Sequence, residues 1–175
     1  FGAITAKQVG GLSTTAIANF STTQLGSMTS TQVRGLTATQ LNSLAATELN
    51  ALDATALATS QMASLTGTAV TTLTTTQVAS LSATQFGAMS TAGVAALTTE
   101  ELGDLNTAQA KALTAQQLAA MSATNFAALS STTGLPALSV SAIAGISTQA
   151  IALLSSTQAN AFDQTQIQAM SADQI

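Results

Sequence analysis

The sequence predicts an all-α solenoid in which each eight-residue repeat forms one very short, capped helix. Three observations lead to this prediction: an octad that recurs along the chain, a capping box at one place in the octad, and two apolar positions that flank the box. The octad has the pattern Leu-[Ser/Thr]-x-x-[Gln/Glu]-Leu-x-[Ala/Gly/Ser], and residues 36–43 (Leu-Thr-Ala-Thr-Gln-Leu-Asn-Ser) are an example. Such a short internal period is typical of repeat architectures, so we expect residues 1–175 to form a single repeat domain.

The octad frame is defined by a large apolar residue at position 1. Position 2 is Ser, Thr, Asp or Asn almost everywhere, with Ala45 as the break, and position 5 is most often Gln or Glu. Position 6 is usually apolar, and positions 7 and 8 are mostly small. Units begin at Ile4, Leu12, Phe20, Met28, Leu36, Leu44, Leu52, Leu65, Leu73, Leu81, Met89, Leu97, Leu105, Leu113, Met121, Leu138, Ile146, Leu154, Phe162 and Met170.

This frame places two helix-start signals on the same residues. If position 2 is the N-cap, position 5 is N3, and Ser/Thr-x-x-Gln/Glu is a capping box. Positions 1 and 6 then become N′ and N4, the apolar pair of a hydrophobic staple. Residues 81–86, Leu-Ser-Ala-Thr-Gln-Phe, carry the whole signature. We therefore expect a helix that starts at each position 2 and ends before the next one.

Simpler secondary structures fit the octad poorly. In one continuous helix, eight residues advance about 80° past two turns, so the apolar stripe would rotate around the axis. In one flat strand, positions 1 and 6 would point to opposite faces because they differ by an odd number. A β-solenoid with one strand and one turn per octad remains the alternative, because Thr, Val and Ile favour strands.

A helix of this length is not stable alone, since isolated helices shorter than about 12 residues are marginal in water. The units must therefore stack on one another, as repeats do in solenoids. Small residues at positions 7 and 8 would let successive turns approach closely.

Two units depart from the octad. Leu52 and Leu65 lie 13 residues apart, three fewer than two octads, and we assign the deficit to residues 57–64, where Ser60–Ser64 read as a truncated unit. Residues 129–137 form a unit with one extra residue that contains Gly134 and the only proline, Pro136. We expect a kink or bulge there, because proline lacks the N–H that a regular unit would use.

The composition excludes several classes of function. Charged residues make up only 6 % of the chain, with a net charge of −4, and the bases Lys7, Arg34 and Lys111 form no cluster in the sequence. Nucleic acid is not an expected partner, because its binding depends on clustered Lys and Arg. No apolar run approaches 18 residues, so we expect no membrane insertion. The chain has no Cys and no His, which removes thiolate ligands and thiol catalysis.

We expect no catalytic, cofactor-binding or metal site, and no enzyme. Glu100, Glu101 and Asp104 lie close in sequence and could bind a divalent cation weakly. Glu101 is better interpreted as the N3 acid of its capping box, and the other two as a solvated face. Serine and threonine are abundant, but a nucleophilic hydroxyl needs a neighbouring base, and the sequence has no histidine to act as one.

The octads resemble those of very large bacterial secreted and surface proteins of the adhesin-like kind; residues 73–80, Leu-Thr-Thr-Thr-Gln-Val-Ala-Ser, are typical. The resemblance covers essentially the whole chain. It implies an extracellular or cell-surface location and a structural or adhesive role, without cofactors. The family's Gly-Gly-x-Gly-x-Asp calcium motifs do not occur, and no binding residue can be transferred from it.

The expected function is that of a structural protein, a subunit or segment of an extracellular filament or surface stalk. Phe1 and Ile175 both occupy position 6, so the repeat is interrupted within a unit at both ends, and uncapped solenoids tend to stack. We therefore expect self-association by repeat stacking and head-to-tail contacts. The alternative is a surface-binding module that uses threonine rows for adhesion or ice binding, motivated by the hydroxyls at positions 2 to 4.

Overall fold

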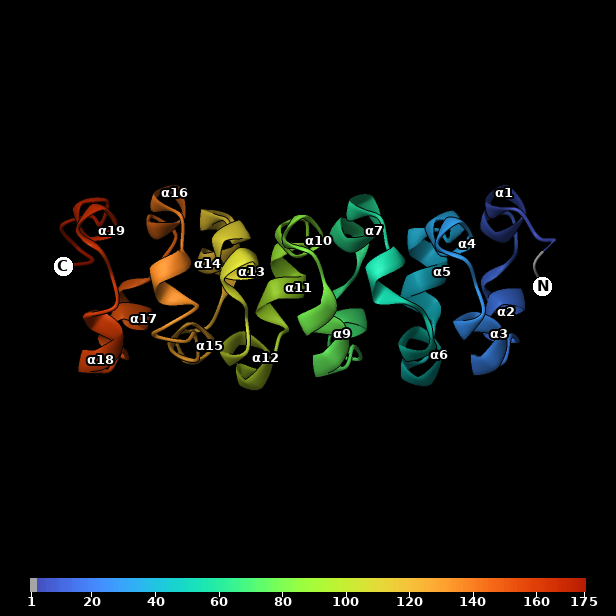
Figure 1. The fold of residues 1–175 in the computed structure, drawn as a ribbon, viewed down its shortest axis with the longest axis horizontal. Coiled ribbons are helices and arrows are strands. Elements are labelled where there is room, and N and C mark those ends of the chain that lie inside the picture. The colour runs from blue at the N-terminus through green and yellow to red at the C-terminus, as the bar shows by residue number, and fades with distance from the viewer. Residues whose placement is uncertain (1–2) are drawn as a thin grey trace.

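The computed structural model describes residues 3–175, and within that range it contains short helices and no strand. The all-α prediction is confirmed and the β-solenoid alternative is wrong. Figure 1 shows an elongated rod with the N- and C-terminal ends at opposite tips.

The helices are five residues long or close to it, as the octad requires. The α-helices are α1 (Ala6–Gly10), α2 (Thr14–Ala18), α3 (Thr22–Gly26), α4 (Ser30–Gly35), α5 (Ala38–Ser43), α6 (Ala46–Ala51), α7 (Thr59–Ser64), α8 (Gly67–Val70), α9 (Thr75–Ser80), α10 (Ala83–Gly87), α11 (Thr91–Ala95), α12 (Thr99–Gly103), α13 (Thr107–Ala112), α14 (Ala115–Ala120), α15 (Ala123–Ala127), α16 (Val140–Ile143), α17 (Thr148–Ala152), α18 (Ser156–Ala159) and α19 (Gln164–Gln168). Two 3₁₀ segments are η1 (Ala54–Ala56) and η2 (Leu135–Ala137).

The capping box starts these helices as the sequence predicts. In α3, the Ser21 hydroxyl accepts a hydrogen bond from the Gln24 backbone N–H at 3.2 Å, and Gln24 Oε1 accepts from the Ser21 N–H at 2.9 Å. The N-cap residue has extended backbone angles, with φ −66° and ψ 157°. Each box satisfies two of the N–H groups that a helix start leaves without a partner.

Three elements complete one turn of the solenoid, because nearly all of the packed pairs join elements that are three apart in chain order; the pair α5 and α8, on either side of η1 and α7, is the exception. The elements therefore form three columns along the rod. Column A contains α1, α4, η1, α9, α12, α15 and α17. Column B contains α2, α5, α7, α10, α13, η2 and α18. Column C contains α3, α6, α8, α11, α14, α16 and α19.

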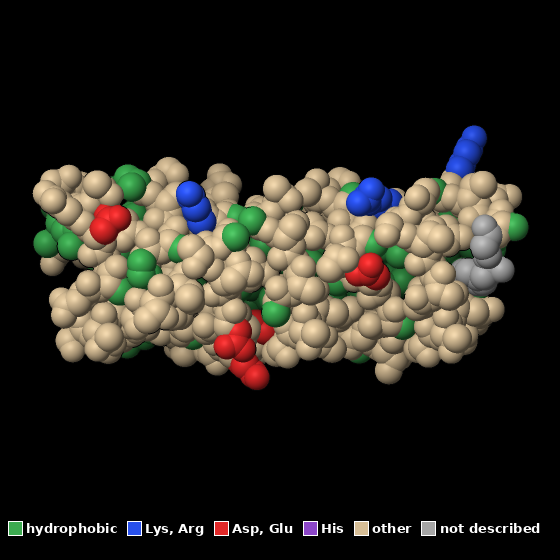
Figure 2. Space-filling model, in the orientation of Figure 1, with side chains coloured by type: hydrophobic (Ala, Val, Ile, Leu, Met, Phe, Trp, Pro, Cys, Tyr) green, Lys and Arg blue, Asp and Glu red, His purple; other side chains and the backbone are tan. Residues whose placement is uncertain are grey.

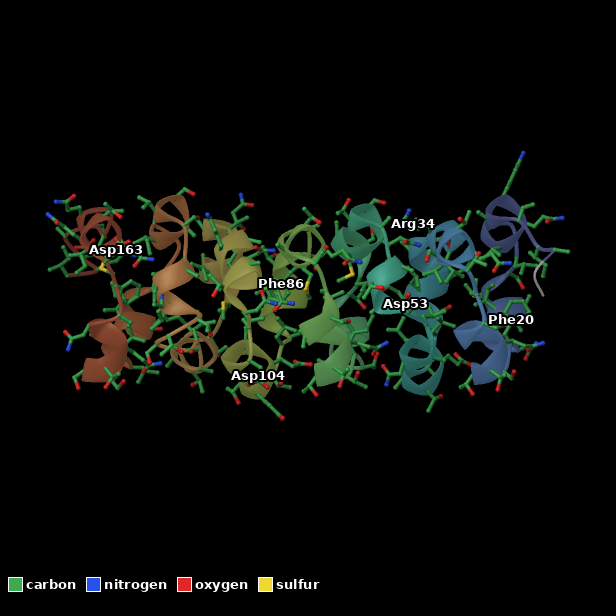
Figure 3. All side chains as sticks on the ribbon, viewed as in Figure 1. Phe20, Arg34, Asp53, Phe86, Asp104 and Asp163 are labelled. Atoms are coloured by element: carbon green, nitrogen blue, oxygen red, sulfur yellow. The ribbon has the colours of Figure 1, made fainter. Side chains whose placement is uncertain are left out.

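Positions 1 and 6 form one continuous core along the axis. Leu81 at position 1 is 3 % exposed, and Phe86 at position 6 of the same unit is fully buried. In Figure 3, Phe86 lies near the long axis of the rod. The staple pair of one octad is thus also its contribution to the core, as the sequence predicts.

Small residues let stacked helices touch through their backbones. A methyl group on Gly35 in α4 would overlap the backbone of Ala6 in α1, one turn below in column A. Gly145 lies in the same way against Ala115. Both positions therefore require glycine for packing between turns.

The first irregularity lies at a different place from the one expected. Residues 57–64 form a complete octad that contains α7, with Gln61 Oε1 accepting from the Ala58 N–H at 2.7 Å. The short unit is residues 52–56, which form η1 in place of an α-helix. The 13 residues from Leu52 to Ser64 can be read as a full unit followed by a short one, or as a short unit followed by a full one. The structure shows the second arrangement, because Leu57 is buried in the core as a position-1 residue.

The second irregularity lies at 129–137, where Leu135–Ala137 form η2 in place of an α-helix. The N–H groups of Gly134 and Leu135 both donate to the Ser130 carbonyl, at 3.0 and 2.8 Å. This wide turn accommodates the extra residue, and Pro136 lies inside the 3₁₀ segment, where its missing N–H breaks no helical bond.

Restoring a missing cap should stabilise the rod. Ala45 starts α6 with no side-chain cap, so Ala45→Ser should raise the free energy of unfolding by about 1 kcal/mol. The urea midpoint would show the change. Ala46→Ser, one residue later at an exposed helical position, is the control and should give no increase.

Candidate functional site

The glutamine at position 5 is the polar side chain on which the arrangement of turns depends. Eight of these glutamines are at most 7 % exposed: Gln32, Gln40, Gln61, Gln85, Gln109, Gln117, Gln166 and Gln174. Long polar side chains are rarely buried unless they are fully paired. Their burial therefore calls for more partners than the capping box supplies.

The side-chain amide nitrogen supplies those partners. Gln109 Nε2 donates to the carbonyl oxygens of Val78 and Leu81, both at 2.9 Å, which lie one turn earlier. Gln40 makes the same pair of bonds to Val9 and Leu12, at 2.9 and 2.8 Å. These carbonyls belong to the end of one helix and the start of the next unit, so the amide bridges two turns at a corner of the solenoid. We call this contact the glutamine bridge.

The glutamine bridge recurs along the rod, and in the turn formed by α15, η2 and α16 Asn125 takes its place. The acceptors one turn earlier are Ile4 for Gln32, Val33 and Leu36 for Gln61, Asn50 and Leu52 for Gln77, Ala54 and Leu57 for Gln85, Gly87 and Met89 for Gln117, Ala127 and Leu129 for Gln158, Leu135 and Leu138 for Gln166, and Ile143 and Ile146 for Gln174. Bridges across the short unit all keep the position-1 carbonyl as an acceptor, from Leu36, Leu52 and Leu57, so the three columns stay in phase through η1.

Departures from glutamine separate its two roles. Glu101 Oε2 accepts from the Thr98 N–H at 2.8 Å, which keeps the cap, but a carboxylate has no N–H to bridge to the turn below. Asn125 does the reverse: its Nδ2 donates to the Leu97 carbonyl at 3.0 Å, while its shorter side chain makes no bond to the Ser122 N–H. Only glutamine has both the reach and the donor.

The three acidic residues that lie close together in the sequence belong to one short helix. Glu100, Glu101 and Asp104 all lie on or beside α12, where Glu101 is buried in its capping box and the other two are exposed; Figure 3 shows Asp104 at the outer edge of the rod. Within residues 3–175 no group of three or more acids is arranged to hold a metal ion. The Thr165 hydroxyl and the Gln166 N–H hold the pKa of Asp163 below its ordinary value.

Charged residues are few, and the face drawn in Figure 2 shows a small group of acidic side chains at the lower edge and single charged side chains elsewhere, on a background of other residues. The helices of column B, as far as the structure describes them, carry a single charged residue, Lys111. Exposed hydroxyls occupy position 4 along that column, at Thr15, Thr39, Ser60, Thr84, Thr132 and Thr157, with Ala108 as the break. We call this set the threonine row.

A groove of about 450 Å³ opens beside η1. Its wall combines the guanidinium of Arg34 with hydroxyl side chains from α7, α9 and the start of α10. The sequence did not predict this groove, because its residues come from several turns and meet only where the unit at 52–56 is short. Nothing in the composition marks Arg34 as different from the other two bases.

Within residues 3–175 no helix has the length and hydrophobicity needed to cross a bilayer.

Removing only the donor of a bridge should destabilise the rod. In Gln109→Glu the carboxylate keeps the cap acceptor but faces the carbonyl oxygens of Val78 and Leu81. We expect a loss of about 2 kcal/mol or more in the free energy of unfolding, because buried acceptors lose their donor and a charge is buried. Gln116→Glu makes the same charge change at an exposed position and should leave the urea midpoint nearly unchanged.

Adding the missing donor should have the opposite effect. In Glu101→Gln, the new side-chain amide can donate to a backbone carbonyl in the turn that contains Leu73. The substitution also removes a buried charge. The expected gain is about 1 kcal/mol, measured as thermal and urea midpoints. Glu100→Gln, which removes an exposed charge from the same helix, should give less; equal gains would show that charge alone is responsible.

Comparison with known proteins supports the assignment of the chain as a repeat protein. A family model described as "ALTTAQ repeat" matches residues 1–38, which include α1 to α4. No curated protein and no solved structure matches the chain. The family match and the helical stacking together identify the chain as a helical repeat protein.

Proposed function

We propose that this chain is a structural rod, a segment of an extracellular filament or surface stalk. The observation that carries the proposal is the glutamine bridge, which joins successive turns along the rod by the same hydrogen bonds. Repeated contacts between neighbours give a solenoid its stability and its stiffness along the axis. A rod held in this way is suited to bear load or to act as a spacer.

The surface between turns supports assembly beyond a single chain. Ile143 in column C is fully buried by the turn above it, whereas Ile167, the equivalent residue one turn later, is 44 % exposed. Leu153, at the end of α17 in the same last turn, is 56 % exposed. A further turn, from this chain or from a second copy, would cover this apolar surface. Head-to-tail contacts that do not close produce fibres.

The composition supports a location outside the cell or on its surface. The chain lacks cysteine and has few lysines, and its surface hydroxyls resemble those of bacterial surface repeats. We include a non-enzymatic role in the proposal, because the side-chain contacts that recur between turns are amide–carbonyl hydrogen bonds that hold the rod together.

Electron microscopy and sedimentation of the purified chain test the proposal. We expect long uniform rods whose length grows with protein concentration, because each added copy buries apolar surface. Ile167→Glu should reduce the assembly strongly, while Thr157→Glu, an exposed change in column B, should not. A chain that stays a short monomeric rod at millimolar concentration, with Ile167→Glu indistinguishable, would contradict self-assembly.

The threonine row favours one alternative, a surface-binding module. Six exposed hydroxyls share one octad position along column B, where the helices carry only one charge. Such a row could match a periodic solid such as ice or carry attached sugars. Ice growth in the presence of micromolar protein, and the intact mass of natively produced protein, distinguish this role from a purely structural one.

A further inference from the structure

We propose that the groove beside η1 binds a sugar that carries a carboxylate group. This inference does not depend on self-assembly or on the location of the protein. It rests on four features of the groove: its origin in the short unit, a guanidinium with free donors, hydroxyl oxygens that can only accept, and an apolar floor.

The groove exists because one unit is short. Residues 52–56 form η1 in a position of column A that a full α-helix occupies in the neighbouring turns, α4 below and α9 above. The space of about 450 Å³ is bordered by these turns and by α7 and the start of α10 in column B. A small ligand can therefore contact three successive turns at once.

Arg34 supplies the positive charge. Its Nε donates to the Ala56 carbonyl at 3.2 Å, which anchors the guanidinium beside η1. The bond uses one donor and leaves the two terminal nitrogens, and Arg34 forms no ion pair with an acid among residues 3–175. A guanidinium is a planar fork that matches a carboxylate with two parallel hydrogen bonds. In Figure 3, Arg34 lies at the upper edge of the rod, where it is exposed and a ligand can reach it.

The hydroxyls around Arg34 are arranged to accept hydrogen bonds. Thr55 Oγ1 donates to Asp53 Oδ1 at 2.6 Å, and Ser80 Oγ donates to the Gln77 carbonyl at 2.7 Å. Each oxygen has then used its only proton and keeps lone pairs for a ligand that donates O–H groups. Ser82 and Thr84, which also line the groove, hydrogen-bond each other at 3.0 Å.

The combination selects a class of ligand. An inorganic anion could pair with Arg34 but offers few or no O–H donors to Thr55 and Ser80. A neutral sugar could donate to these oxygens but leaves the guanidinium without a counter-charge. Leu57 and Ala58 add an apolar floor, against which the C–H face of a sugar ring can lie. A uronic acid satisfies all three, with its carboxylate on Arg34 and its hydroxyls on the threonine and serine oxygens.

Titration followed by amide NMR tests the proposal, with glucuronate, glucose, acetate and inorganic phosphate as separate probes. We expect glucuronate to shift the signals of residues 54–60 and 80–85 and to bind more tightly than the other three probes. Acetate or phosphate binding as tightly as glucuronate would show a simple anion site and overturn the assignment to a sugar. Shifts outside the groove, or no shifts with glucuronate, would overturn the site itself.

Variants link the binding to the groove. Arg34→Gln should weaken glucuronate binding by about tenfold or more, because the charge-assisted pair is lost. Arg34→Lys keeps the charge without the fork and should recover only part of the affinity. Lys111→Gln removes a cation from the same octad position in α13, away from the groove, and should bind as the unchanged chain does. Equal affinity of Arg34→Gln and Lys111→Gln would contradict the proposal.

Each variant needs a check that the rod is intact, because Arg34 also bonds to Ala56. Circular dichroism and the thermal midpoint serve for this purpose. Thr59→Phe provides a second, independent variant: it fills the groove from α7 and leaves Arg34 in place. We expect it to abolish glucuronate binding with a normal spectrum, and retained binding would overturn the assignment.

Discussion

The arrangement of turns depends on satisfying carbonyl groups at helix ends. A helix of five residues consists almost entirely of ends, since the first four N–H groups and the last four carbonyls of a helix lack partners within it. A rod built from such helices buries a large number of these groups near its core. The N–H groups are satisfied locally by the capping box, but the carbonyls need a donor from elsewhere. The glutamine side chain supplies it from the next turn, so the local cap and the packing between turns depend on one residue.

This coupling explains why the octad tolerates much variation yet keeps glutamine. A capping box alone is satisfied equally by glutamate, whose carboxylate accepts the same N–H. The preference for glutamine over glutamate at position 5 is therefore the sequence signal for a donor that points to another turn. The capping-box rule groups glutamine and glutamate together, so by that rule the sequence indicates position 5 only as part of the cap. Glu101 and Asn125 each preserve one half of the function, which shows that single units can lose a contact when their neighbours keep theirs.

Local features could be predicted from the sequence because they depend on residues within one octad. The helix starts, the buried pair at positions 1 and 6, and the close contacts at glycines such as Gly35 all follow from short spacings. The number of units per turn could not be predicted, since an octad gives the length of a side of the solenoid and not the angle at the corner. The same limit applied to the short unit, where Leu52 and Leu57 both fit position 1. The groove at Arg34 depends both on the number of units per turn and on the position of the short unit, so no sequence pattern indicates it.

Because three units complete one turn, the chain has a second, longer period of three octads. This period limits how such a chain can be lengthened by duplication of its units. Adding or deleting three units returns every downstream residue to its original column, so the threonine row stays continuous. Adding one unit instead rotates everything beyond it by a third of a turn and exchanges the faces. The unit at 52–56 shows that this rule counts units and not residues, since it lacks three residues and still occupies one full side. A gene of this kind can therefore lengthen its product without disturbing its surfaces only in steps of three octads, whatever the exact length of each.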